Sequence, residues 1–515
     1  MKKIKITKVL SLGSIMIFGL GILASCTAGF EEANRPGGKL DSDDLNKDGY
    51  AAGSFLIQLQ NQAFPEQENT YQMNVDLIGN YCGRYMTYAN TWGNSNFVCM
   101  NAPAGWVKYP FNDCTPKVVS AFNEIARLTG KDGVSYAQAL MLRAQSFLRL
   151  TDLYGPFPIG KEEDPNAYSS QEKVYKALIA DLDSAIAIIN PMVVANRALV
   201  ANAVYDQVYA GKIDSWLKFA NSLKLRMAIR MRFADPAFAK QVGEEAVAAG
   251  VITSNADNVA INYTPNGQYK TSVEWGDSRA CADIESYMNG YKDPRISKYF
   301  KATETAGSRP IIGCRAGAKI GSKDKAMLLY SAANIEQSSP GVWMTAAEMA
   351  FCRAEGALAG WSGMGGSVEE LYNEGIRLSF EQWNATGVDS YITDGVSKPA
   401  NYTDADGGYG ASATAASTIT IQWKETASDE EKLERICTQK WIACFPNGDE
   451  GWAEIRRTGY PKVFAVAQST GSSLLVPNRI PFSADEPTQN PENYKKAVQL
   501  LGGPDDYTTK MWWQR

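Results

Sequence analysis

The chain has 515 residues, of which 45% are hydrophobic and 21% are charged, and this balance is typical of a folded globular protein. Its formal net charge of −5 argues against a nucleic-acid partner. The sequence contains no histidine, which excludes Ser-His-Asp and Cys-His catalytic sites and histidine-ligated metal centres. Any catalysis would therefore depend on carboxylates, Lys, Tyr, Cys or Ser-Lys pairs.

Residues 1–25 have the pattern of a bacterial signal peptide. Lysines precede an apolar run from Val9 to Leu23, which is too short to span a bilayer comfortably. The run ends in Leu23-Ala24-Ser25-Cys26, the lipobox in which signal peptidase II leaves a diacylglycerol-modified cysteine. The alternative is an ordinary signal peptide followed by a chance cysteine. We expect Cys26 to carry a lipid that anchors the protein to a membrane.

The lipidated N-terminus and the polar stretch after it, residues 26–47, predict a flexible tether. At its end Asp44, Asn46 and Asp48 copy the start of a calcium loop, but the twelfth position is Phe55 where a bidentate glutamate is needed. We interpret this pattern as capping of the next helix, and we predict no metal ion and no cofactor. Residues 48–515 are expected to form a single helical domain.

The clearest helical pattern lies between Ser135 and Pro158. Apolar side chains recur there at spacings of three and four, and Gly155-Pro156 ends the helix. A small-large-small order at positions 137, 141 and 144 returns at 347, 351 and 354, which is typical of tetratricopeptide half-motifs. Further helices are expected at 50–64, 115–129, 170–190 (with Pro191 after its end), 216–233, 345–360, 367–383 and 429–445.

Three loop-rich insertions, near 71–113, 250–340 and 388–417, interrupt the helical pattern. The second is expected to contain a short strand at Val259–Tyr263, because its residues alternate. The first carries many aromatic residues interleaved with Asn, Gly and Ser, and aromatic residues on loops are harder to explain as core than those on helices. They form either a platform that stacks on sugars or a satellite core beneath the loops, and both interpretations stay open for Trp92 and Trp106.

Two clusters of charged residues suggest chemistry. Lysines and arginines between 218 and 232 could bind phosphate, but we favour ion pairs along an exposed helix side. Asp449, Glu450 and Glu454 lie beside Trp452, and paired carboxylates of this kind are what a glycoside hydrolase requires. The same acids also lie at a helix start, where they complement the helix dipole.

The Ser135–Pro158 stretch, with its Leu-Arg-Ala, Asp-Leu-Tyr-Gly and Pro, resembles the helix signature of the SusD/RagB family of Bacteroidetes lipoproteins. Further stretches agree in the same order: Trp216–Arg230, Tyr291–Phe300, Trp343–Leu358, Gly448–Pro461, Arg479–Asn493 and the ending 502–513. This resemblance implies a mainly α fold, with a tetratricopeptide-like helical-repeat body, long loop insertions and a few short β-strands.

The resemblance also implies a function. It is that of a glycan- or oligosaccharide-binding lipoprotein on the outer face of the outer membrane, which captures nutrient for import through a SusC-like TonB-dependent transporter. Members dock on the transporter through the helical-repeat face, which is built here on 135–154 and its neighbours. The family implies no catalysis. The alternatives are a peptide-binding member or a helical scaffold, and, least favoured, a carboxylate-dependent glycoside hydrolase.

A sugar site without histidine or metal must combine aromatic stacking with hydrogen bonds from Asn, Asp and Arg. The aromatic residues not explained by helices lie in segments 88–109 and 263–295, and we predict that these segments approach each other at one end of the helical body. The predicted ligand contacts are Trp92, Asn96, Trp106, Trp275 and Tyr287.

Overall fold

The computed structural model describes residues 49–515, apart from residues 91, 93–94, 161–162, 305–306, 406–408, 410–411 and 469–471. Residues 52–515 form one compact unit. The predicted signal peptide, lipidated Cys26, tether and calcium-like pattern at 44–48 lie outside the described residues.

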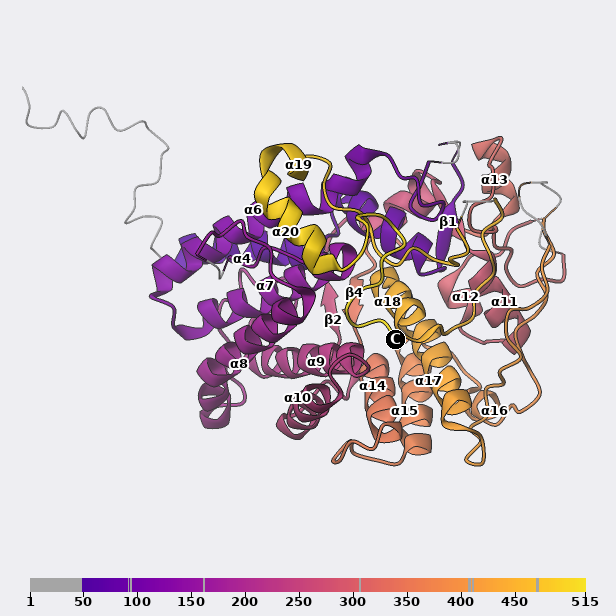
Figure 1. Ribbon diagram of the computed structural model, residues 1–515. Coiled ribbons are helices and arrows are strands. Elements are labelled where there is room, and N and C mark those ends of the chain that lie inside the picture. The colour runs from indigo at the N-terminus through magenta and orange to yellow at the C-terminus, as the bar shows by residue number, and fades with distance from the viewer. Residues whose placement is uncertain are drawn as a thin grey trace, which may run out of the picture. The chain divides into compact units, whose positions relative to one another are not determined.

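The protein is mainly α-helical, as predicted (Figure 1). The helices are α4 Tyr50–Ala63, α5 Glu68–Tyr71, α6 Ala104–Thr129, α7 Gly133–Tyr154, α8 Gln171–Ala195, α9 Ile213–Met231, α10 Pro236–Ala249, α11 Ala282–Tyr291, α12 Ile296–Tyr299, α13 Lys323–Leu329, α14 Ala346–Leu358, α15 Val368–Gln382, α16 Val388–Ile392, α17 Asp429–Cys444, α18 Gly448–Thr458, α19 Glu486–Gln489 and α20 Pro491–Leu501. Shorter turns are the π-helical η2 Gln72–Asn80 and η4 Tyr269–Glu274 and the 3₁₀-helical η3 Asn255–Asp257.

The strands are short and form two antiparallel pairs. Strand β1 (Met86–Tyr88) pairs with β3 (Ser278–Ala280), and β2 (Val259–Ile261) pairs with β4 (Gly341–Met344). The strand expected at 259–263 is therefore present, two residues shorter. The β1–β3 pair joins the first loop insertion to the second, and the β2–β4 pair joins the second insertion to the segment directly before α14.

Successive helices pack side by side through the magenta and orange parts of the chain (Figure 1). Helix α7 lies between α6 and α8, α9 contacts α8, α10 and α14, and α14 contacts α15 and α17. The small and large residues of the two half-motifs, at 137, 141 and 144 and at 347, 351 and 354, are all fully buried. This burial is what a tetratricopeptide-like repeat requires, because its small residues let neighbouring helices approach closely.

Two helices are longer than the sequence indicates. Helix α6 begins at Ala104, inside the expected loop, and contains Pro110 and Pro116; helix α8 continues through Pro191 to Ala195. The prediction that the helix ends before Pro191 is wrong, and so is the start expected near residue 115. Each proline removes one backbone N–H, but apolar residues on both sides of it are buried, and that packing offsets the missing hydrogen bond.

Helix α7 has little surface of its own. From Ala137 to Tyr154 every residue except Arg143 is buried. The C-terminal tail covers part of it: Trp513 is fully buried and donates from Nε1 to Asp152 Oδ1 at 2.8 Å. Docking of a partner on the face built on 135–154 and its neighbours stays a prediction. Because α7 itself is buried, the exposed surface in this part belongs to the neighbouring elements.

Candidate functional site

The two aromatic segments meet along the β1–β3 pair. Tyr88 lies opposite Ser278, and beyond it the Ala89 amide donates to the Asp277 carbonyl at 2.7 Å. The predicted approach of segments 88–109 and 263–295 is therefore confirmed. This short pair holds the loop after β1 next to the turn before β3.

Asp277 is the centre of a polar cluster in this region. Its Oδ1 accepts from Asn90 Nδ2 at 2.7 Å and from Lys323 Nζ at 2.5 Å, and its Oδ2 accepts from Gln72 Nε2 at 3.0 Å. The four residues come from η2, the loop after β1, the turn before β3 and helix α13. Lys323 stays about one-third exposed while Asp277 is largely buried, so the cluster presents a cation and an amide to solvent above a fixed carboxylate.

A pair of tryptophans lies on the chain that follows Asn90. The rings of Trp92 and Trp106 meet edge to face, with centroids 5.3 Å apart, and Phe97 stacks on Trp106 at 6.4 Å. Both tryptophans are partly buried, whereas Phe97 is fully buried. Trp106 belongs to helix α6 and is backed by Phe97, and each indole keeps part of its surface exposed, as stacking on a sugar ring requires.

Two further aromatic residues are connected to the Asp277 cluster: Trp275 is near Asp277 in the sequence, and Tyr409 contacts the helix that carries Lys323. Trp275, two residues before Asp277, is partly buried, and Lys270 Nζ lies 5.4 Å from its ring centroid. Tyr409 is partly buried and faces Lys325 Nζ, 5.7 Å from its ring centroid. Lys325 belongs to helix α13, as does Lys323, so this helix carries lysines toward both Asp277 and an aromatic ring.

Two predicted ligand contacts have structural roles instead. Asn96 is buried and closes a turn: its Oδ1 accepts from the Cys99 backbone N–H at 2.8 Å, and its own backbone N–H donates to Asn101 Oδ1 at 3.0 Å. Tyr287 is 2% exposed, packs on Trp441 and donates its hydroxyl to the Lys462 carbonyl at 2.9 Å. Both side chains are buried, so neither is open to a ligand on the surface, although Asn96 Nδ2 has no hydrogen-bond partner among the described residues.

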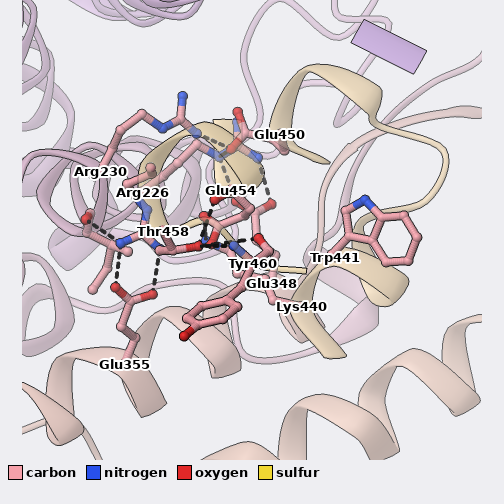
Figure 2. A network of polar contacts seen from close by, with 12 residues as sticks. Arg226, Arg230, Glu348, Glu355, Lys440, Trp441, Glu450, Glu454, Thr458 and Tyr460 are labelled. Atoms are coloured by element: carbon pink, nitrogen blue, oxygen red, sulfur yellow. Dashed lines mark hydrogen bonds and ion pairs between the residues drawn. The ribbon is translucent and has the colours of Figure 1, made fainter. Parts of the chain in front are cut away.

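The acidic residues proposed for hydrolysis belong to an interior network of ion pairs (Figure 2). Glu454 accepts from Lys440 Nζ at 2.7 Å and from Arg457 Nη2 at 2.8 Å. Glu450 pairs with Arg230. Helix α9 also contributes Arg226, which binds Glu348 at 2.7 Å through two nitrogens.

These arginines of α9 are therefore buried ion-pair partners, and the expectation that they line an exposed helix side is wrong. Arg226 and Arg230 are 2% and 3% exposed. Their carboxylate partners come from helices that are distant in the sequence, and the pairs connect α9 to α14 and α18.

This environment does not suit acid–base catalysis. Burial raises the pKa of Glu454, but Arg457 and Lys440 outweigh burial and hold that pKa below its ordinary value, so Glu454 stays ionised. A general acid needs the opposite shift. Burial raises the pKa of Asp449 to about 7, yet both of its carboxylate oxygens are buried away from solvent.

Glu355, Cys437 and Glu454 lie close enough together to suggest a metal site. The positive charge there is already supplied by Arg457, which donates to Glu355 at 2.5 and 2.7 Å and to Glu454 at 2.8 Å. A guanidinium that bridges both carboxylates takes the place that a cation would occupy.

Sequence reasoning missed Gln72, Lys323 and Tyr409. Gln72 lies in a π-helical turn, and Lys323 begins a short surface helix in an insertion. Neither position carries a periodic or spacing signal, because the contact with Asp277 spans 205 residues for Gln72 and 46 for Lys323.

Comparisons with known proteins agree with the resemblance in the sequence. A family model described as "Susd and RagB outer membrane lipoprotein" matches residues 32–514. Similar solved structures are a SusD homologue from Bacteroides thetaiotaomicron (36% identity, TM-score 0.84, covering 90% of this chain and 99% of that one) and one from Bacteroides uniformis (38%, 0.85, 91% and 100%). Another, described as a chitin-binding SusD homologue, is from Flavobacterium johnsoniae (34%, 0.85, 90% and 98%). No curated protein matches this chain.

Proposed function

Because this chain belongs to the SusD-like family of outer-membrane lipoproteins, we propose that it binds a glycan or oligosaccharide at the cell surface and captures it for import through a SusC-like TonB-dependent transporter. The observation that carries the proposal is the partly exposed pair Trp92–Trp106 beside the polar cluster of Asp277. A relative that is 34% identical is described as chitin-binding, which supports a saccharide ligand.

In the proposed site, aromatic rings stack on the sugar and polar groups form hydrogen bonds with it. The indoles of Trp92 and Trp106 stack on the apolar face of a sugar ring, and Asn90 and Lys323 donate to its hydroxyl groups. Asp277 fixes the positions of both donors through the hydrogen bonds described above. Because little surface is buried at a platform of this kind, binding of a single sugar unit is modest, and longer chains gain from additional contacts.

The location follows from the family and from the lipobox. Cys26 carries the lipid, the protein lies on the outer membrane with its binding face toward the exterior, and a SusC-like barrel is its partner. We propose no cofactor and no nucleic-acid partner. We also propose no catalytic activity, since Glu450 and Glu454 of α18 are held in interior ion pairs and Asp449 is buried.

The test is Trp92→Ala with a panel of glycans that includes chitin oligosaccharides and α-mannan, measured by isothermal titration calorimetry. We expect at least a tenfold loss of affinity for the glycan that the wild type binds. The cost in unfolding free energy is about 1 kcal/mol, since one edge-to-face ring contact is lost from a partly buried position.

The matched control is Trp512→Ala, a partly buried tryptophan that packs on Tyr175 in another part of the chain. It should keep wild-type affinity. Unchanged binding in Trp92→Ala would move the site away from the platform, and binding of peptides with no binding of any glycan would replace the saccharide by a peptide ligand.

A further inference from the structure

We propose that the protein has a second saccharide pocket, separate from the tryptophan platform, which takes the end of a neutral sugar chain. The pocket has a volume of about 470 Å³ and lies between the β2–β4 pair, the C-terminal end of α15 and the Phe445–Pro446 turn. Pockets of about 300–1,000 Å³ are typical of small-ligand sites. It shares no lining residue with the platform, so it adds to the proposed function instead of restating it.

The lining of this pocket is polar but uncharged. Among the described residues that line it there is no Asp, Glu, Lys or Arg, although charged residues make up 21% of the chain. Its polar groups are amides, one hydroxyl and an indole: Asn255, Asn258, Asn334, Ser339, Gln382 and Trp383. A charged ligand would lose hydration here without gaining a counter-charge, whereas hydroxyl and acetamido groups find both donors and acceptors.

Trp383 gives the pocket a fixed aromatic wall. Its ring lies 4.6 Å from the ring of Tyr299 and 6.0 Å from that of Phe445, measured between centroids, and both of these rings are buried. Trp383 itself remains partly exposed. An indole that is packed on one side and open on the other loses little conformational freedom when a sugar ring stacks on it.

Two buried polar atoms at the end of α15 have no protein partner. Gln382 Oε1 is an acceptor and Trp383 Nε1 is a donor, and neither makes a hydrogen bond within the described part of the chain. Leaving such groups unpaired costs about 1–3 kcal/mol each. Both residues line the pocket. Because both atoms are covered in the free protein, a bound hydroxyl group, which donates and accepts, pairs with either one only after that side chain turns toward it.

Two amide side chains of the lining are held in place by hydrogen bonds. Asn258 Oδ1 accepts from the Ala346 amide at 2.8 Å, and its Nδ2 donates to Asn255 Oδ1 at 3.2 Å. Asn255 in turn donates to the Leu378 carbonyl at 3.0 Å. These bonds orient the amides in advance, so binding does not have to order them.

The experiment uses the Trp92→Ala protein, in which the platform is disabled. The probes are three neutral disaccharides, N,N′-diacetylchitobiose, lactose and maltose, with the anionic 3′-sialyllactose for comparison, and the readout is saturation-transfer NMR of the sugar signals. We expect at least one neutral disaccharide to bind. Adding Ala260→Phe, which fills the pocket from strand β2, should weaken that binding at least tenfold, and Gln382→Leu should weaken it in the same direction.

The control is Ala187→Phe in the same background, because Ala187 is exposed on helix α8. It should leave binding unchanged, and a thermal melt confirms that each variant is folded. The proposal is overturned if no neutral disaccharide binds to Trp92→Ala protein, if binding survives both pocket variants, or if 3′-sialyllactose binds through the pocket as well as lactose does. The first of these results would overturn the second pocket but not the proposed site at Trp92 and Trp106, so the two proposals can fail separately.

Discussion

Glu454 shows how much a single side chain contributes to folding stability when it pairs with two buried cations. Lys440 and Arg457 each donate to its carboxylate, and all three side chains are buried. Such a network is stable only while its charges remain balanced, because an unpaired buried charge is costly.

Glu454→Gln should therefore lower the unfolding free energy by about 3–5 kcal/mol, since a neutral amide leaves Lys440 and Arg457 under-compensated. Denaturant unfolding at neutral pH measures the change. The matched control is Glu124→Gln, which removes an exposed pair with Arg127 and should cost no more than about 1 kcal/mol. A loss for Glu454→Gln as small as that of the control would show that the interior pairs add little stability.

The residues of the candidate site could be predicted only in part. An indole in an Asn- and Gly-rich loop has few core partners nearby in the sequence, and Trp92 is indeed partly exposed. Tyr287 was also selected because it is an aromatic residue in a segment without a clear helical pattern. It is buried in α11, where its ring packs on Trp441 and its hydroxyl donates to the Lys462 carbonyl. Exposure depends on which distant element covers a segment, and one sequence does not reveal that element. Whether Trp92, Trp106 and Trp275 contact a ligand stays a prediction.

At the scale of the element, Gly375 shows how closely helices α14 and α15 pack against each other. It lies inside helix α15 and faces Phe351 of α14, and a Cβ atom at this position would come 2.7 Å from the Phe351 ring. In an open helix position, alanine is more stable than glycine by about 1 kcal/mol. At Gly375 the Phe351 ring occupies the space of a methyl group, so alanine would not gain this stability.

We expect Gly375→Ala to destabilise the protein by about 1–3 kcal/mol, because the ring of Phe351 or the helix itself must shift. Gly105 in helix α6 has open space around its Cα, and Gly105→Ala should be neutral or slightly stabilising. Comparing the melting temperatures of the two variants tests the helix contact directly. Equal behaviour of the two would mean that α14 and α15 adjust to an added methyl group without cost.

The helices that follow apolar stripes could be predicted from the sequence, and those that contain prolines could not. Helices α7, α14 and α15 appear within a few residues of their expected bounds, because their core faces repeat every three or four residues. Helix α6 was missed over its first turns, since the aromatic residues interleaved with Asn, Gly and Ser near 71–113 suggest a loop. Tertiary packing overrides that local preference.

At the scale of the whole molecule, buried carboxylates make stability depend on pH. Burial raises the pKa of Glu66 to about 7, although hydrogen bonds from the Gly267 amide and from Trp343 Nε1 lower it. The unfolded chain releases this proton near pH 4.5 and the folded protein near pH 7. The contribution of Glu66 is therefore complete below pH 4.5 and is lost as the pH rises to 7.

The unfolding free energy should consequently fall between pH 5 and pH 8, and Glu66→Gln should reduce that fall by about 3 kcal/mol at most. Part of the decline remains in the variant, because burial also raises the pKa of Asp76 to about 6 and that of Glu285 to about 7. Urea unfolding at the two pH values measures the difference, and exposed Glu369→Gln is the control. A free energy that rises over this range would contradict the assignment.

Anchoring is the remaining property of the whole molecule, and it is separable from folding and binding. Residues 52–515 form a compact unit with its own core, so we expect Cys26→Ala to fold without its lipid. The variant should appear in the soluble fraction, keep a far-UV spectrum dominated by helix, and bind the same glycan with the affinity of the wild type, because the platform residues lie far along the chain from position 26. Membrane fractionation and calorimetry measure these outcomes side by side. If Cys26→Ala stays in the membrane fraction with the detergent behaviour of the wild type, the anchor is not the lipid on Cys26, and the processing predicted for residues 1–25 is wrong.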